Sequence, residues 1–424
     1  MKILYANKYF FRNGGSETVM FDEIALMESM GIQVIHFSMD DPRNLPSPTA
    51  SHFVGTKSYH TRSISEGFRS AASFVHSPEA VRKISALIEA ERPDVLHCHN
   101  IYHQLTPSII SAAARHDVPV VLTLHDLKVV CPIYTQIRDG RLCTECSPTR
   151  FENVLLHKCG GYSPPKRLLL WLEARYHQVA GSYQDVSTFI APSRFLRDAV
   201  ASRFPADRIE YMPNGIDLTG IRVSPFDEGY VLYLGRIARD KGVDTLLQVH
   251  ADEGATWRLV LAGTGPELEE YKSRFPQAEF AGFLSGDALQ SCIDAAAVVV
   301  APSEVQENCP MSIIKAMAHG KPMVASRIGG IPELVRHGET GFLIEAKDRR
   351  DMANRIRTLL ENADLRKRFG SAGREVIENE YTMDGHGHAL VSLYTRLSRE
   401  RKRSAGTFPS IPLAAGTGPG ESAL

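Results

Sequence analysis

The 424-residue sequence lacks long apolar runs, and it carries almost no excess charge of either sign. No segment approaches the roughly 18 apolar residues of a membrane-spanning helix, and the apolar stretch at the amino terminus is too short for a signal peptide. Lysine and arginine number 48 against 49 aspartate and glutamate, which argues against a basic nucleic-acid-binding surface over the whole chain. We therefore expect a cytoplasmic protein without a nucleic-acid partner.

Cysteine is also scarce, and four of the seven cysteines fall close together, at Cys131, Cys143, Cys146 and Cys159. The two-residue spacing between Cys143 and Cys146 suits two thiolates on one tetrahedral metal ion, and the outer pair completes a four-cysteine set. Four thiolates leave no open position for chemistry, so a bound zinc ion would be structural. Free thiols or a pair of disulfides are the alternatives.

Short apolar segments of the kind that form buried parallel strands alternate with helix-like segments along the chain. In the first half we expect strands at residues 2–6, 33–37, 95–97, 118–124, 186–191 and 209–212. In the second half we expect them at residues 230–234, 258–262, 278–281, 297–301, 322–325 and 341–344. Strands that alternate with helices predict an α/β fold with doubly wound parallel sheets.

Turn-forming residues divide the chain into two halves of similar size. We expect an N-terminal domain over residues 1–205, with a cysteine-rich insertion at 131–159, and a linker over 206–228 that is rich in proline and glycine. A second domain is expected over residues 229–384, then a helix over 385–403 and a disordered tail over 404–424. The basic end of that helix suits either a solvated terminus or a peripheral contact with the inner face of the cell membrane.

Paired glycines, Gly14 and Gly15, separate the first predicted strand from the first predicted helix. Glycines let a ligand approach the backbone closely, and the helix that follows presents free N–H groups to a phosphate or sugar. A tight turn with Ser16 as the N-cap and Glu17 in the first helical turn explains the same pattern.

Histidines follow two other predicted strands of the first half, at His97 and His99 and again at His125, which precedes Asp126. The carboxyl ends of strands face the ligand site in open α/β sheets, and His97 and His99 point to the same side of a strand. A metal site would need a further ligand that is not obvious nearby. Contacts with sugar hydroxyls or a structural role fit this pair better, and a loop hydrogen bond to Asp126 is the alternative for His125.

Charged residues follow two predicted strands of the second half. Arg236 and Lys241 bracket a turn that enters a helix, and two cations beside a helix N-terminus suit a diphosphate; a pair of solvated surface charges is the alternative. Gly263 and Gly265 form a weak Gly-x-Gly signal after the next strand. Glu307 precedes a helix start, where its carboxylate either accepts hydrogen bonds from sugar hydroxyls or only stabilises the helix.

Taken in order, these motifs resemble those of the family 4 glycosyltransferases of the GT-B fold, over about residues 1–395. The matching positions are Gly14-Gly15-x-Glu17, His97-x-His99, His125-Asp126, Ala191-Pro192-Ser193, Pro213-Asn214-Gly215-Ile216-Asp217, Gly235-Arg236 with Lys241-Gly242, Gly263-x-Gly265-Pro266, Glu307 and the run from Gly329 to Val335. The four-cysteine insertion looks like that of one bacterial subgroup that works on surface polysaccharides.

The resemblance implies two Rossmann-like domains that face each other across a cleft, with the donor on the second domain and the acceptor on the first. It implies His125, Glu307, Arg236 and Lys241 as catalytic residues. The remaining residues that it implies at the donor are Gly14, Gly15, Gly263, Gly265, Asn308, Cys309, Pro310, Met311 and Lys315. At the acceptor it implies His97, His99, Asn100 and Asp126. Catalysis then rests on positioning and charge stabilisation, without a protein nucleophile or a cofactor.

One position departs from the family pattern. A second glutamate normally lies eight residues after the first and holds the nucleotide ribose, but here that position is Lys315. An ammonium group only donates hydrogen bonds, so ribose binding should weaken by about 1–3 kcal/mol. Lys315 is then either tolerated in an active enzyme, suited to an unusual donor, or the mark of a non-catalytic relative.

The expected function is retaining transfer of a sugar from a nucleotide-sugar donor to a glycan or lipid-linked acceptor, in the biosynthesis of surface or secreted polysaccharide. The alternative is a catalytically degenerate GT-B protein that serves as a binding or scaffold component of a polysaccharide assembly system. A nucleotide-sugar epimerase or a sugar phosphorylase on the same fold is a third and weaker hypothesis.

Overall fold

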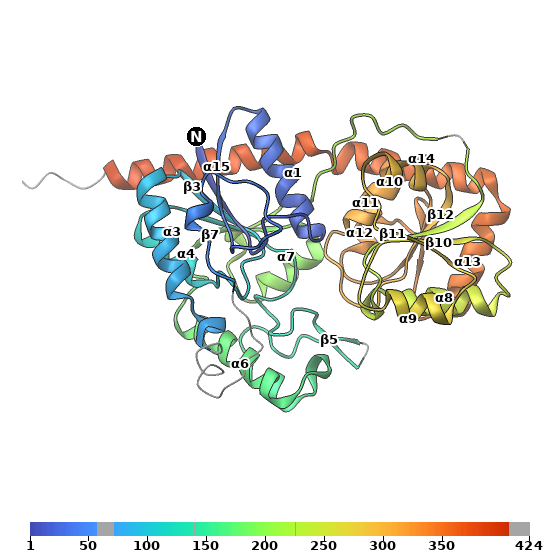
Figure 1. Cartoon of the computed structure of the whole chain (residues 1–424), viewed down its shortest axis with the longest axis horizontal. Coiled ribbons are helices and arrows are strands. Elements are labelled where there is room, and N and C mark those ends of the chain that lie inside the picture. The colour runs from blue at the N-terminus through green and yellow to red at the C-terminus, as the bar shows by residue number, and fades with distance from the viewer. Residues whose placement is uncertain (57–71, 140, 225, 407–424) are drawn as a thin grey trace, which may run out of the picture.

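The computed structural model describes residues 1–56, 72–139, 141–224 and 226–406. Figure 1 shows two α/β halves side by side and one long helix that crosses the first half. Residues 407–424, most of the predicted disordered tail, lie outside the described residues. Within the described part, no helix combines the length and the apolar character needed to cross a bilayer.

Each half contains a six-stranded parallel sheet. The first sheet has the order β2-β1-β3-β4-β7-β8 and the second β11-β10-β9-β12-β13-β14. The strands of the first sheet are β1 (Lys2–Ala6), β2 (Gln33–Phe37), β3 (Val95–Cys98), β4 (Val120–Thr123), β7 (Val186–Ala191) and β8 (Ile209–Tyr211). Those of the second are β9 (Tyr230–Leu234), β10 (Leu259–Ala262), β11 (Glu279–Gly282), β12 (Ala296–Ala301), β13 (Met323–Ser326) and β14 (Gly341–Ile344).

The predicted doubly wound α/β fold is confirmed, and every strand expected from the sequence is present with its ends displaced by no more than two residues. The predicted linker over residues 206–228 begins too early. Strand β8 lies within that range and pairs in parallel with β7, Phe189 opposite Ile209, so the first sheet continues to Tyr211.

Helices connect the strands of both sheets. In the first half they are α1 (Gly15–Ser29), α3 (Pro78–Glu91), α4 (Ser108–Arg115), α5 (Asn153–Leu156), α6 (Pro164–Val179) and α7 (Arg194–Ala201). In the second half they are α8 (Val243–Asp252), α9 (Leu268–Arg274), α10 (Gly286–Asp294), α11 (Met311–Ala318), α12 (Ile331–Leu334), α13 (Arg349–Glu361) and α14 (Ala363–Glu380). A short hairpin, β5 (Ile137–Arg138) with β6 (Arg141–Leu142), lies in the cysteine-rich insertion.

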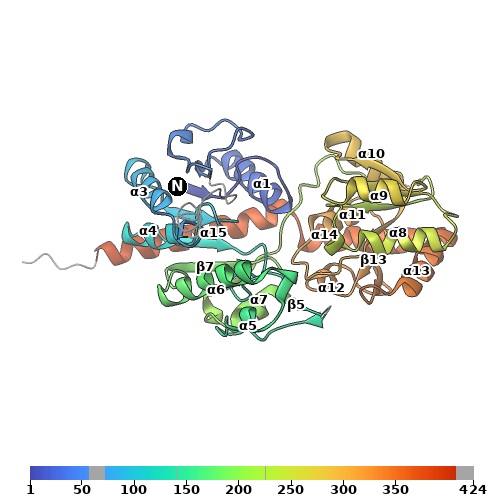
Figure 2. The same ribbon diagram turned by 60° about the horizontal axis from the view of Figure 1, so that its bottom comes forward.

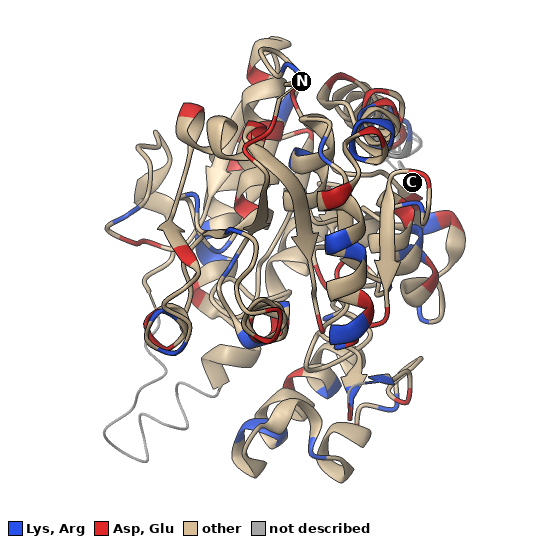
Figure 3. Ribbon diagram, turned by 90° about the vertical axis from the view of Figure 1, so that its right-hand side faces the viewer, with Lys and Arg blue, Asp and Glu red and all other residues tan. Residues whose placement is uncertain are grey.

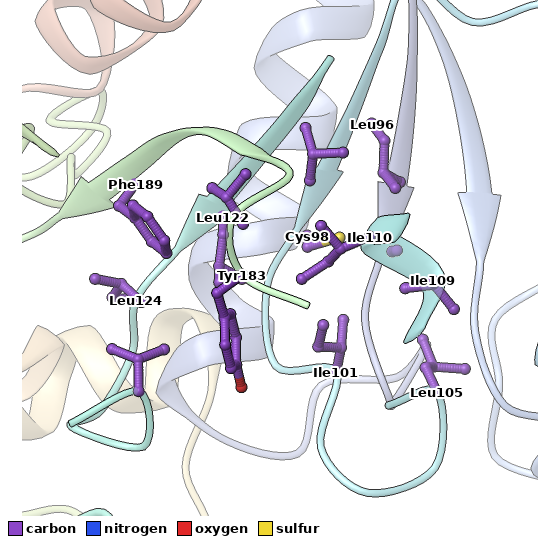
Figure 4. Packing of buried hydrophobic residues seen from close by; sticks show 14 of the residues in the cluster. Leu96, Cys98, Ile101, Leu105, Ile109, Ile110, Leu122, Leu124, Tyr183 and Phe189 are labelled. Atoms are coloured by element: carbon purple, nitrogen blue, oxygen red, sulfur yellow. The ribbon is translucent and has the colours of Figure 1, made fainter. Parts of the chain in front are cut away.

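Apolar side chains are buried on both faces of each sheet, as parallel sheets require. Figure 4 shows part of the larger cluster in the first half, where Leu122 of β4 and Phe189 of β7 lie on the side of the sheet that α4 covers with Ile109 and Ile110. Each fully buried side chain of this size contributes about 2 kcal/mol relative to an exposed one. The two cores hold the strand ends in fixed positions.

The long helix α15 (Met383–Gly406) starts at the second half and packs on the first sheet. In Figure 1 and Figure 2 it runs along the first half, where it contacts α1 and β3. Its Leu390, Leu393 and Tyr394 are at most 1% exposed against the first sheet. Where the chain enters this helix, the linker passes so close that a Cβ on Gly215 would lie 2.7 Å from the Met383 Cα atom.

Two basic residues near the end of α15 have partners within the protein. Arg396 forms an ion pair with Glu210, and the Arg401 Nη1 atom donates to the Pro93 carbonyl at 2.9 Å. Figure 3 shows the ribbon from the side of the second domain, where lysine and arginine alternate with aspartate and glutamate along the chain. The two contacts attach this part of the helix to its own domain, and a peripheral membrane contact stays a prediction.

Candidate functional site

The candidate donor site lies in loops at the carboxyl ends of the central strands of the second sheet, the edge at which open α/β sheets bind ligands. Gly235 and Arg236 follow β9, and Glu307 lies in the loop between β12 and α11. Lys241 ends the turn that precedes α8. The topology therefore brings together charged residues that lie about 70 positions apart in the sequence.

Glu307 and Lys241 form the central ion pair of this loop cluster. The Lys241 ammonium donates to Glu307 Oε1 at 2.5 Å, and the Ser303 hydroxyl donates to the same oxygen at 2.8 Å. Both charged side chains remain partly exposed, at 28% for Lys241 and 17% for Glu307. The carboxylate is thus oriented by two donors while a face of the pair stays open to a ligand.

Arg236 belongs to the same group of loops, after β9, and is more exposed than Lys241 or Glu307. Its guanidinium donates to Asp240 at 2.7 Å, and more than half of its side chain is accessible to solvent. An exposed arginine held by one carboxylate can turn to an anion with little cost.

Several glycines in this region permit backbone contacts that a side chain would block. A Cβ on Gly329, whose φ is +58°, would lie 2.1 Å from the Glu307 carbonyl oxygen, and one on Gly263 would lie 1.8 Å from the Gly235 carbonyl oxygen. A Cβ on Gly265 would similarly meet the Ile237 carbonyl oxygen at 2.0 Å. A side chain at Gly263 or Gly265 would displace the 235–237 loop, so these two glycines affect the site by allowing that loop to pack closely against them.

Asn308, the neighbour of Glu307, joins the two domains. Its amide nitrogen donates to the Leu124 carbonyl at 2.9 Å, and its amide oxygen accepts from the Ser193 hydroxyl at 2.6 Å. Because Leu124 precedes His125, these bonds bring the loop of Glu307 against the loop of His125. The predicted donor-binding side chain of Asn308 is occupied by this interdomain contact.

The next residues lead into α11. Cys309 is buried, and burial raises the pKa of its thiol to about 12, so it remains protonated. Pro310 is the N-cap residue and Met311, half-buried, is the first residue of the helix. The side chain of Cys309 is thus part of the core, and any donor contact from this segment falls to its backbone or to its neighbours.

Lys315, one turn further along α11, is half-buried. Burial lowers the pKa of its ammonium, the Asp22 carboxylate raises it, and the Arg12 guanidinium lowers it again. Asp22 and Arg12 belong to the first half of the chain and pair with each other at 2.9 Å. Lys315 therefore faces the amino-terminal half, on the side of α1.

Gly14 and Gly15 lie where the sequence places them, between β1 and α1. Gly14 is the N-cap residue without a side-chain cap, so the alternative with Ser16 as the cap is wrong. A Cβ on Gly15 would meet no atom within 4 Å. The start of α1 is consequently open to a ligand.

His97 and His99 point to the same side of β3, as predicted, with ring centroids 4.3 Å apart. Both are buried, and the two ring nitrogens of His97 are hydrogen-bonded to Tyr394 at 2.6 Å and Thr123 at 2.7 Å. His97 therefore does not reach an acceptor, which corrects the acceptor-binding role implied for it and supports the structural alternative.

Glu23 of α1 completes a buried cluster that the sequence did not reveal. One ligand atom each from Glu23, His97 and His99 lies within 4.8 Å of the others, and the Glu23 side chain is 1% exposed. Glu23 also accepts from His386 of α15 at 3.0 Å. Burial raises the pKa of Glu23, but His99 and His386 outweigh it and hold the pKa well below its usual range.

His125 is hydrogen-bonded to His99, with 3.0 Å between its Nε2 atom and His99 Nδ1, and not to Asp126. Burial lowers the pKa of His125 to about 3, so the ring is neutral. Asp126 instead accepts from the Lys128 backbone N–H at 2.8 Å. His99, Asn100, His125 and Asp126 line one small cavity together, so three of the four residues implied at the acceptor lie beside His125.

All four cysteines of the insertion are free thiols and lie near one another, which removes the disulfide alternative in this structure. Burial, with smaller effects from Cys131, Cys159 and Cys143, raises the pKa of Cys146 to about 12. Among the described residues, however, no three of the four sulfur atoms lie within 4.8 Å of one another. A metal ion would have to draw the thiolates closer together.

Glu333 is a further interdomain residue that sequence patterns did not single out for this role. Its carboxylate accepts from the backbone N–H groups of Arg194 and Phe195, at 2.8 Å each, at the start of α7. A carboxylate at a helix N-terminus is favourable. Its partner lies about 140 residues away, so no local signal could have indicated the pair.

Comparison with known protein families assigns both halves of the chain. The family described as Glycosyltransferase Family 4 matches residues 13–219, and the one described as Glycosyl transferases group 1 matches residues 221–376. Together the two matches cover most of the chain and meet within the predicted linker.

Two curated relatives illustrate the sequence similarity. The alpha-maltose-1-phosphate synthase of Mycolicibacterium smegmatis is 28% identical over 345 residues, which are 73% of this chain and 80% of that protein. The sulfoquinovosyl transferase SQD2 of Arabidopsis thaliana is 36% identical over 153 residues, 35% of this chain and only 30% of the plant protein.

Solved structures show the same fold. A sucrose-phosphate synthase from Thermosynechococcus elongatus superposes with a TM-score of 0.71 at 20% identity, over 94% of this chain and all of that one. Anabaena HepE, solved with UDP and glucose, gives a TM-score of 0.67 at 19% identity, over 93% of this chain and all of the other. The chain therefore belongs to the family 4 glycosyltransferases and has the GT-B fold.

Proposed function

We propose that the protein is a retaining glycosyltransferase that moves a sugar from a nucleotide-sugar donor to a glycan or lipid-linked acceptor in the biosynthesis of surface or secreted polysaccharide. The observation that carries this proposal is the Lys241–Glu307 pair, fixed by Ser303 and joined through Asn308 to the loop of His125. It offers a cation to a diphosphate and a carboxylate to sugar hydroxyls at one point.

On this proposal Lys241 and Arg236 stabilise the charge that develops on the departing diphosphate. The open N-terminus of α1 at Gly15 adds backbone N–H groups to the same anion. Glu307 accepts hydrogen bonds from hydroxyl groups of the donor sugar, which fixes the sugar between the two domains. Preorganised charges of this kind supply much of the rate enhancement when no protein nucleophile is used.

The proposed reaction exchanges one bond at the anomeric carbon for another on the same face. The bond between the anomeric carbon and the phosphate oxygen breaks, and a bond to the acceptor oxygen forms. The acceptor hydroxyl gives its proton to the leaving phosphate oxygen, so no residue of the protein is changed. The neutral His125 ring lies beside this centre and contacts a sugar hydroxyl.

We also propose that the four cysteines of the insertion bind one structural zinc ion when it is available. Support comes from the free state of all four thiols and their mutual proximity in a lobe built on the two-residue strands β5 and β6. When bound, zinc would hold Cys131, Cys143, Cys146 and Cys159 as thiolates and pin this lobe to the first domain.

A second candidate function is a binding or scaffold protein on the same fold, and Lys315 favours it. The position that holds the ribose in the family carries a half-buried ammonium in this chain. Such a protein would have lost nucleotide binding and kept the interdomain contacts.

Calorimetric titration of UDP, GDP, ADP and dTDP into the wild type and Lys315→Glu separates the two functions. The enzyme proposal predicts that the wild type binds one of the four nucleotides. A wild type that binds none, together with a Lys315→Glu variant that binds one, would favour the scaffold function and contradict the enzyme proposal.

A further inference from the structure

A chain of buried polar groups runs from the interdomain linker to His125. It starts at the Pro213 carbonyl, which lies 2.8 Å from His386 Nδ1, and His386 Nε2 lies 3.0 Å from Glu23 Oε1. Glu23 Oε2 is 3.3 Å from His99 Nε2, and His99 Nδ1 is 3.0 Å from His125 Nε2. Glu23, His99 and His386 are all buried.

The partners of His386 determine its protonation. A carbonyl oxygen and a carboxylate oxygen can only accept hydrogen bonds, so both ring nitrogens of His386 must donate. His386 is therefore an imidazolium cation. Its positive charge balances the Glu23 carboxylate, which its neighbours keep ionised.

The other groups packed around Glu23 add no charge. Both nitrogens of His97 are taken by hydroxyl groups, and burial lowers its pKa well below the usual value. The Tyr5 and Tyr394 hydroxyls lie 3.0 Å apart, and burial raises both pKa values well above the ordinary one. Glu23 and His386 thus form a pair of opposite charges. A second cation at His99 would leave this buried cluster with a net positive charge, which is costly to bury, so His99 is neutral.

A neutral His99 has one proton to place. Its Nε2 lies 3.3 Å from Glu23 Oε2, and neither atom forms a regular hydrogen bond in the described part of the chain. A proton on Nε2 is attracted to the carboxylate, whereas a lone pair there would be repelled. The proton therefore lies on Nε2, and Nδ1 is left as the acceptor that faces His125.

We propose that Glu23 is a positioning residue that, through His99, fixes the tautomer of His125. His125 carries its proton on Nε2 and donates it to His99 Nδ1, so its own Nδ1 presents a lone pair to a substrate hydroxyl. Burial lowers the pKa of His125 to about 3, which keeps this lone pair free at neutral pH. The role in sugar transfer rests on the proposed function, but the tautomer is a property of the free protein.

Nitrogen NMR of the full chain labelled with 15N-histidine measures this tautomer directly. The signals of His125 are identified by their loss in His125→Asn. In the wild type we expect a protonated, pyrrole-type Nε2 and an unprotonated, pyridine-type Nδ1. In Glu23→Gln the carboxylate that holds the proton of His99 is gone, so the two nitrogens of His125 should exchange character or average.

The matched control is Asp294→Asn, which alters a carboxylate that lies 2.7 Å from the buried His319 in the second domain. This variant should change His319 and leave His125 unaltered. If Glu23→Gln does not fold, His99→Gln tests the same dependence. A wild type with the proton on Nδ1 of His125, or a folded variant whose His125 signals match the wild type, would overturn the proposal.

A catalytic readout separates this inference from the proposed function. Once a donor is identified, Glu23→Gln should lower kcat at least tenfold while nucleotide affinity stays within twofold of the wild type. Equal kcat in the variant and the wild type would refute the positioning role. The absence of any turnover in the wild type would refute the proposed function and leave the NMR result standing.

Discussion

Replacing Lys241 with alanine tests the donor site through its central cation. The ammonium makes a 2.5 Å contact with Glu307, and the lysine side chain is still 28% exposed. Such a partly exposed pair contributes only about 1 kcal/mol to folding. A charged hydrogen bond to a diphosphate is worth about 1.5–3 kcal/mol. We therefore expect nucleotide affinity to fall about 10- to 100-fold while the melting temperature changes little.

Calorimetry with the nucleoside diphosphate that binds the wild type measures this effect. The matched control is Lys272→Ala, which removes a similar lysine paired at 3.0 Å with Glu269 on the surface of α9. The control should bind as the wild type does. Affinity within twofold of the wild type in a folded Lys241→Ala protein would refute the diphosphate role of Lys241.

Three further predictions concern the rest of the structure. Glu333→Ala should lower the free energy of unfolding by about 1–2 kcal/mol in urea titrations, because two N–H groups at the start of α7 lose their acceptor; an unchanged value would show that the domains are not joined there. Elemental analysis should find about one zinc per chain, lost in Cys143→Ser with a fall in stability; a zinc-free wild type of full stability would end the zinc proposal. Glu173 pairs with Lys128 at 2.7 Å, and although burial raises its pKa, Lys128 and His103 together bring it to about 2. Its contribution, at most about 3 kcal/mol, should be complete above pH 4.5 and disappear as the pH falls toward 2. The stability difference between the wild type and Glu173→Gln should therefore vanish over that range, and a constant difference would contradict the assignment.

The sheets were predictable because buried parallel strands are short apolar segments separated by helices, a pattern that survives without knowledge of tertiary contacts. The strand ends then placed Arg236, Glu307 and His125 at the correct edges of their sheets. Which charged side chains form ion pairs was not predictable in the same way. Lys241 and Glu307 were each recognised, but nothing local indicated that they meet.

The roles of His97 and Glu23 show what local patterns omit. His97 lies near the end of β3, on the face of the first sheet that α1 and α15 cover. The sequence does not show this cover, so the buried His97 was mistaken for a histidine accessible to a ligand. Glu23 sits beside Asp22 in a helix with several acidic residues, so it resembled part of a solvated face. Its histidine partners come from β3 and from α15, the latter more than 350 residues away.

The proposed retaining sugar transfer is tested most directly by measuring the anomeric configuration of the product. The full chain is incubated with UDP-glucose, GDP-mannose, ADP-glucose and dTDP-glucose in turn, and proton NMR records the anomeric configuration of the first sugar product. We predict that one donor is consumed with retention of configuration, and that Glu307→Gln and Lys241→Ala lose this activity. Inversion of configuration, or consumption that both variants retain, would contradict this prediction.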